Sequence, residues 1–84
     1  VTLSCRGSGF SFKDFDIFWY RQAPGGSLEW VSFISYSGKV KKYGAAVKSR
    51  ATASRDNYQS QSSLVLEALH PSDSARYFCG IYTV

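Results

Sequence analysis

The chain has 84 residues, of which 44% are hydrophobic, and a formal net charge of +4 at pH 7. This length allows one domain, and the small, dispersed charge excludes a nucleic-acid binder because no run of Lys and Arg exceeds two residues. No apolar stretch approaches the roughly 18 residues that a membrane span requires, so we expect no direct membrane contact.

Short alternating apolar runs separated by Gly, Ser, Pro and Asp predict an all-β chain. Val1, Leu3 and Cys5 alternate with polar residues, so a first strand should carry them on one face. In the segment 17–22, large apolar side chains occur at both odd-numbered and even-numbered positions, which predicts a strand that is covered on both faces. Turns are expected at 23–26 and 36–38, with a strand over 28–34 between them.

The second half continues the pattern. Residues 50–55 alternate small side chains before a turn at 56–57, and Leu64 and Leu66 share a face of the next strand. Pro71 predicts a corner over 68–74, and a last strand is expected over 75–80. No helical period of useful length is present.

Cys5 and Cys79 are the two cysteines of the chain, and a disulfide is their simplest interpretation. It would close a loop of about 75 residues and contribute roughly 4 kcal/mol of stability. A disulfide implies an oxidising compartment, so the chain should be secreted or lie on the extracellular side of the cell surface. Two thiols and one histidine do not make up the four ligands of a structural zinc site, and we expect no metal or cofactor.

Catalysis is not expected. The only histidine, His70, lies with Ser72 and Asp73 in the segment 69–73, and consecutive corner residues cannot converge as a triad with an oxyanion hole. The aromatic content instead indicates binding. Fourteen aromatic residues (2 Trp, 6 Tyr and 6 Phe) are more than this core should bury, so some are expected on a contact surface.

Four residues carry a family resemblance: Cys5, Trp19, Tyr77 and Cys79. A disulfide across two stacked sheets, a tryptophan covering it and a tyrosine two residues before the second cysteine mark the immunoglobulin sandwich. Framework-like stretches surround them: GFSF at 9–12, WYRQAPG at 19–25, LEWV at 28–31, SRDN at 54–57 and DSARYFC at 73–79. The chain resembles, over essentially its whole length, an immunoglobulin heavy-chain variable domain (V-set) or a closely similar heavy-chain-like T-cell receptor variable domain.

The resemblance implies one V-type β-sandwich of two antiparallel sheets over residues 1–84, joined by an inter-sheet disulfide. The family fold would add one strand before Val1 and one after the third loop. It also implies antigen recognition by three loops at one end, over about 13–18, about 33–42 and from near 82, and we expect a protein or peptide antigen. The expected contacts are Lys13, Asp14, Phe15, Asp16, Phe18, Phe33, Ser35, Tyr36, Ser37, Lys39, Lys41, Tyr82 and Thr83.

The cluster Lys39, Lys41 and Lys42 has two interpretations. It could complement an acidic target, or it could be a solvated edge strand that lysine protects from other strands. We favour the edge strand.

A second surface is implied on the outer face of one sheet, formed by Tyr20, Gln22, Leu28, Trp30 and Phe78. In antibodies this face pairs with a light-chain variable domain, and Leu28, Trp30 and Gln22 fit that role. Tyr20 departs from the family, which usually has a small valine there, and resembles domains that work unpaired. The resemblance also implies a structural ion pair between Arg50 and Asp73.

Two alternatives to an antibody chain remain. A heavy-chain-like domain of a T-cell receptor, which could be unpaired, is compatible with the sequence around 71–79 and with Tyr20. A V-set adhesion or co-receptor domain of fixed specificity would bind one protein partner instead.

Overall fold

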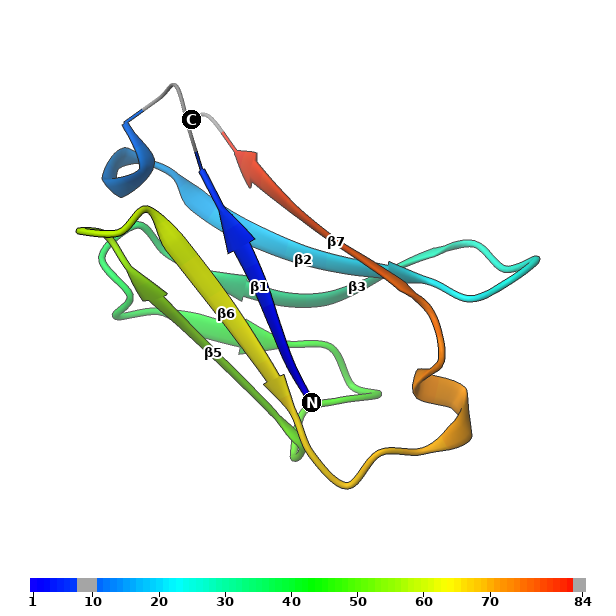
Figure 1. Ribbon diagram of the computed structural model, residues 1–84. Helices are drawn as coiled ribbons and strands as arrows, with labels where there is room; N and C mark the ends of the chain where they lie inside the picture. Colours follow the sequence, from blue (N-terminus) through cyan, green and yellow to red (C-terminus); the bar gives the residue numbers. More distant parts are fainter. Residues whose placement is uncertain (8–10, 83–84) are drawn as a thin grey trace.

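A computed structural model describes residues 1–7 and 11–82 of the chain. Seven strands and two single-turn 3₁₀ helices make up this part (Figure 1). The strands are β1 (Thr2–Arg6), β2 (Asp16–Gln22), β3 (Leu28–Ile34), β4 (Lys41–Tyr43), β5 (Ala51–Asp56), β6 (Gln61–Leu66) and β7 (Arg76–Tyr82). The 3₁₀ helices are η1 (Phe12–Asp14) and η2 (Pro71–Asp73).

The strands form two antiparallel sheets that lie face to face, as Figure 1 shows. One sheet has the strand order β1-β6-β5 and the other β4-β3-β2-β7. The disulfide between Cys5 in β1 and Cys79 in β7 joins them, with its Cα atoms 6.4 Å apart. The predicted all-β sandwich with one inter-sheet disulfide is therefore confirmed.

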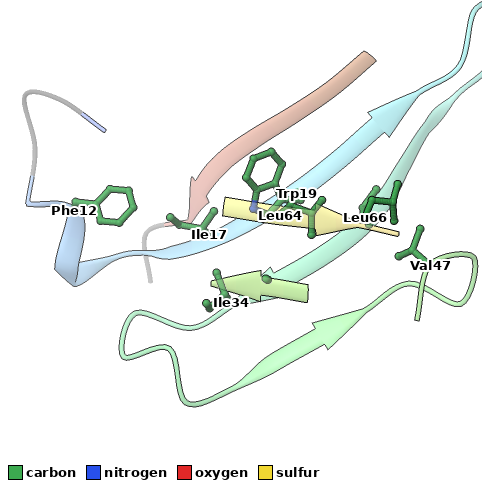
Figure 2. Close-up of a cluster of buried hydrophobic side chains, with 9 residues drawn as sticks. Phe12, Ile17, Trp19, Ile34, Val47, Leu64 and Leu66 are labelled. Atoms are coloured by element: carbon green, nitrogen blue, oxygen red, sulfur yellow. The ribbon is translucent and has the colours of Figure 1, made fainter. Parts of the chain in front are cut away.

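The core lies between the sheets and follows the strand alternation. Trp19 is 2% exposed, and Figure 2 shows it beside Leu64 of the facing sheet. Phe12 closes one end of this cluster and Val47 the other. Because alternate residues of β2 and β6 are buried, each strand contributes one row of side chains to the interior, apolar except for Arg21 and Ser62.

A β-bulge in β3 changes which of its side chains point inward. Trp19 pairs with Ser32, but Tyr20 pairs with Trp30, so Val31 is an extra residue on β3. Val31 and Ser32 are consequently both buried, which strict alternation forbids. The bulge allows Ser32 to face the core while Trp30 lies on the outer face.

The turns use the residues that their backbone requires. Between β2 and β3, the Gly26 N–H donates to the Ala23 carbonyl over 2.9 Å, and Gly25 has φ +73°. Pro24 followed by a glycine of positive φ is the sequence of a type II turn. The strand and turn predictions over 23–34 are therefore correct, whereas the last strand extends to Tyr82 and not to Gly80 because β7 pairs with β2 as far as Asp16.

We expect Gly44→Ala to lower the free energy of unfolding by about 1–3 kcal/mol, the usual penalty for overpacking. A Cβ atom at this position would lie 2.7 Å from the Trp30 carbonyl oxygen, and the Gly44 N–H holds the Val31 carbonyl over 2.8 Å. Urea unfolding measures the change. Gly80→Ala is the matched control, since its Cβ would meet nothing within 4 Å; equal effects of the two substitutions would contradict the prediction.

Candidate functional site

Three connecting segments gather at one end of the sandwich: η1, the turn between β3 and β4, and the turn between β5 and β6 (Figure 1). β7 ends at the same side, where Tyr82 pairs with Asp16. We call this surface the loop end. It joins segments that are 20 to more than 40 residues apart in the chain, and hydrogen bonds from side chains connect them.

Arg55, the fifth residue of β5, is the main connector of the loop end. Its Nη1 donates to the Ser35 carbonyl over 2.8 Å and its Nη2 to the Phe12 carbonyl over 2.9 Å. Its guanidinium carbon lies 4.8 Å from the centre of the Phe12 ring, in cation–π geometry. Burial lowers the pKa of Arg55, and the charge of Asp16 opposes that shift. The planar donor fork of arginine fixes two loops at once.

The turn between β3 and β4 is fixed by its own hydrogen bonds. The Asp16 carboxylate accepts from the Tyr36 N–H over 2.8 Å, and the Ser35 hydroxyl oxygen accepts from the Val40 N–H over 3.1 Å. Gly38 has φ +78°, and its N–H donates to the Ser35 carbonyl over 2.9 Å. The turn therefore presents its remaining side chains from a defined backbone.

Most of the expected contact residues reach the surface of the loop end. The exposed ones are Lys13, Asp14, Tyr36, Ser37, Lys39 and Lys41. Phe15 and Asp16 are half-buried, and Tyr82 is the last residue of β7. Thr83 lies outside the described residues.

Three of the expected contacts are not exposed side chains of these loops. Ser35 is 8% exposed, and its hydroxyl oxygen accepts from the Val40 N–H within the turn, so the side chain supports the turn; its contact with a ligand stays a prediction. Phe18 and Phe33 lie in paired strands and not in loops. Their rings are 4.9 Å apart on the outer face of the four-stranded sheet, because residues paired across an antiparallel ladder point to the same side.

This outer face is rich in large apolar groups. Leu28 is 57% exposed and Trp30 37% exposed, while Tyr20 and Phe78 are half-buried. The Phe18 ring stacks on Tyr20 at 6.4 Å, and the Arg76 guanidinium lies 5.1 Å from the Phe78 ring. The set expected to form a partner surface therefore shares one sheet face.

Gln22 makes a hydrogen bond within its own chain. Its side-chain Nε2 donates to the Gly26 carbonyl over 3.0 Å, so this amide supports the neighbouring turn of its own chain. The same amide has a second N–H and a carbonyl oxygen with which it could bond to a partner domain.

The opposite end contains a cluster of charges around Asp73, which is 7% exposed. The ion pair with Arg50 is present, with Nη1 2.6 Å from Oδ2. Arg21 also reaches this carboxylate, with Nη1 2.8 Å from Oδ1, and its Nε contacts Glu29 at 2.6 Å. The Tyr77 hydroxyl donates to the Asp73 carbonyl over 2.8 Å, as in the tyrosine corner of the immunoglobulin sandwich.

Hydrogen bonds from Arg50 hold the pKa of Asp73 well below its ordinary value, against the opposing effect of burial, and the His70 N–H and Arg21 add to this. Burial would lower the pKa of Arg21, but its hydrogen bonds to Tyr77, Glu29 and Asp73 raise it. All three described ion pairs belong to this cluster, whose role is structural.

A family model described as the immunoglobulin V-set domain matches residues 1–84. The chain belongs to the immunoglobulin V-set family. V-set domains are typically binding domains that are secreted or extracellular. Within residues 1–7 and 11–82 of this V-set domain, no group of three or more His, Cys, Asp and Glu side chains could hold a metal ion. No helix in that part of the chain is long and apolar enough to cross a membrane.

Sequence reasoning missed the residues that organise this V-set domain from inside. Arg55 and Asn57 connect the loops, and Arg21 is the second cation on Asp73. Alternation did indicate that Arg21 shares a face with the buried Trp19, which was the available signal. An arginine on a core-facing row needs an acidic partner.

Proposed function

We propose that this V-set domain recognises antigen as the heavy-chain variable domain of an antibody, through its loop end. The proposal is supported by exposed side chains of amphipathic or adaptable type on these loops, whose backbone Arg55 holds by a hydrogen bond to the Ser35 carbonyl. They are Lys13, Asp14, Tyr36, Ser37 and Lys39. Binding by a preorganised loop loses little conformational entropy. The antigen would be a protein or peptide, and the domain would work outside the cell without catalysing a reaction.

We further propose that the outer face of the β4-β3-β2-β7 sheet pairs with a light-chain variable domain. The observation that supports this most is the exposure of Leu28 and Trp30 on a sheet face that also carries Tyr20 and Phe78. A contiguous apolar patch is costly to leave in water and marks a protein interface.

Pairing can be tested by mixing the full-length chain with light-chain variable domains and measuring heterodimer formation by analytical ultracentrifugation. Leu28→Arg should weaken the heterodimer about tenfold or more, because it places a charge in the apolar centre of the interface. Leu69→Arg is the matched control, since Leu69 is also 57% exposed but lies near η2, away from this sheet face. A soluble monomer without affinity for any light chain would overturn the pairing.

A second candidate is a heavy-chain-like variable domain of a T-cell receptor chain that works unpaired. Two contacts favour it: the Gln22 amide bonds within its own chain, and the Tyr20 ring stacks on Phe18 and so covers part of the face itself. The constant domain encoded after this segment in full-length transcripts distinguishes the two receptors. Many different sequences after Cys79 in one animal would support either receptor, whereas one invariant continuation would favour a fixed-specificity adhesion or co-receptor domain.

A further inference from the structure

Positive charge is concentrated in and beside β4. Lys39, Lys41 and Lys42 occupy three of four consecutive positions, at the end of the β3–β4 turn and in the strand itself. No aspartate or glutamate occurs in the sequence between Glu29 and Asp56, which flank this segment on either side. We call the three lysines the basic edge. Short lysine-rich segments are one sequence feature of patches that bind heparin and other polyanions.

No acidic group of the described residues neutralises these lysines by contact. The three ion pairs in this part of the chain are all made by arginines and belong to the cluster at the opposite end of the sandwich. The flanking acids are engaged: Glu29 contacts Arg21, and the Asp56 carboxylate accepts from two backbone N–H groups of the turn that follows it. All three lysines of the basic edge are exposed, so an anionic ligand can reach them.

The backbone that carries the basic edge is fixed by hydrogen bonds from both sheets. The Ser32 hydroxyl of β3 donates to the Lys42 carbonyl over 3.0 Å. The Tyr43 hydroxyl of β4 accepts from the Ala53 N–H over 2.9 Å, which ties β4 to β5 of the facing sheet. A ligand that binds the lysines therefore orders only their side chains, and this lowers the entropic cost of binding.

The lysines leave β4 on both of its sides. β4 is the outermost strand of the sheet β4-β3-β2-β7. Lys42 pairs with Phe33, whose ring lies on the outer face, whereas Lys41 pairs with the buried Ile34. Because paired residues of an antiparallel ladder point to the same side, Lys42 and Lys41 leave the strand on opposite faces. A flat protein surface docked on one face would meet one of these two lysines, whereas a linear polyanion that lies along the edge can contact both.

We propose that the basic edge binds a linear sulfated polysaccharide of the glycosaminoglycan class. Sulfate and carboxylate groups repeat along such a chain, and lysine ammonium groups bind them as point charges that need no fixed donor geometry. The release of counterions from a dense polyanion favours its binding, as it does for nucleic acids. The proposal goes beyond antigen recognition, because it assigns a second class of ligand to the β4 side of the sandwich.

The test measures binding of the full-length chain to an immobilised, size-defined heparin oligosaccharide by surface plasmon resonance over a series of NaCl concentrations. Lys41→Gln combined with Lys42→Gln should raise Kd about tenfold or more and make Kd less dependent on salt, because two ionic contacts are lost. Arg6→Gln combined with Lys48→Gln is the matched control. It removes the same charge from exposed positions on β1, the strand farthest from β5 in its sheet, and beside Val47 at the far end of the core. At physiological ionic strength it should change Kd less than about threefold.

Thermal unfolding shows whether each variant is folded, and exchange of exposed lysines for glutamine should leave the melting temperature unchanged. Equal losses of affinity in the two double variants would mean that binding follows net charge alone, and would overturn the basic edge as a site. Binding to vesicles of phosphatidylserine and phosphatidylcholine without binding to heparin would assign the lysines to a membrane surface and rule out the polysaccharide. A parent chain that does not bind heparin at any salt concentration would refute the proposal and leave antigen recognition untouched.

Discussion

Replacing Asp73 by alanine should lower the free energy of unfolding by about 3 kcal/mol, the order of loss found when one partner of a buried ion pair is removed. Arg21, whose side chain is 8% exposed, would lose the carboxylate that its Nη1 contacts at 2.8 Å, and the His70 N–H would lose its acceptor. Arg50 would lose both of its bonds to the carboxylate. Chemical denaturation at pH 7 measures the change.

Glu67→Ala is the control for this substitution, because Glu67 is an exposed acid near the same end. It should change the free energy of unfolding by less than about 0.5 kcal/mol. If Asp73→Ala were as mild as Glu67→Ala, the charge cluster would not stabilise the sandwich.

The contribution of Asp73 should also depend on pH. Its pKa in the folded chain is lowered, chiefly by Arg50, below the value of about 3.9 expected in the unfolded chain. The ionised carboxylate therefore stabilises the fold fully above the unfolded pKa, and this stabilisation is lost as the pH falls from about 4 towards the lowered pKa. The difference in unfolding free energy between the parent chain and Asp73→Asn should be constant near neutral pH and shrink below about pH 4. A difference that stays unchanged from pH 7 to pH 2 would contradict this account.

Much of the fold could be predicted because local patterns determine it. The strand over 28–34 is correct at both ends, since glycines precede it and a Tyr-Ser-Gly turn follows it soon after. The bulge at Val31 could not be predicted in this way. One extra residue leaves no mark in composition, and whether it is accommodated depends on the register with β2, which is set by tertiary packing.

The loop end was predicted in outline but not in its connections. Exposed Tyr36 and Lys39 follow from loop composition, whereas the burial of Ser35 depends on its bond to Val40 across the turn. Arg55 resembles any charged residue beside a turn. Its acceptors on Ser35 and Phe12 are 20 and 43 residues away in the chain, so only the assembled sandwich brings them within reach.

Removing the disulfide by Cys5→Ala together with Cys79→Ala should lower the free energy of unfolding by about 4 kcal/mol. Cys5 and Cys79 are separated by 74 positions in the sequence. In the chain-entropy model, a disulfide that closes a loop of about this length stabilises the fold by about 4 kcal/mol, because it restricts the unfolded chain. A chain of this size has a total stability of roughly 4–13 kcal/mol, so the variant should be marginal or unfolded at 37 °C. Denaturant unfolding of the parent chain and the double variant measures the difference.

The parent chain after reduction, with its thiols kept free, should match the double variant, because both lack the same constraint on the unfolded state. Trp19 would report the loss, since it is 2% exposed between the two sheets that the Cys5–Cys79 bond joins and becomes solvated when they separate. If mass spectrometry found the thiols of Cys5 and Cys79 free in folded protein of undiminished stability, the proposed contribution of the disulfide would be refuted. The loop end would then lack the rigid frame on which its proposed role depends, because a sandwich of this size has few other ways to hold two sheets in register.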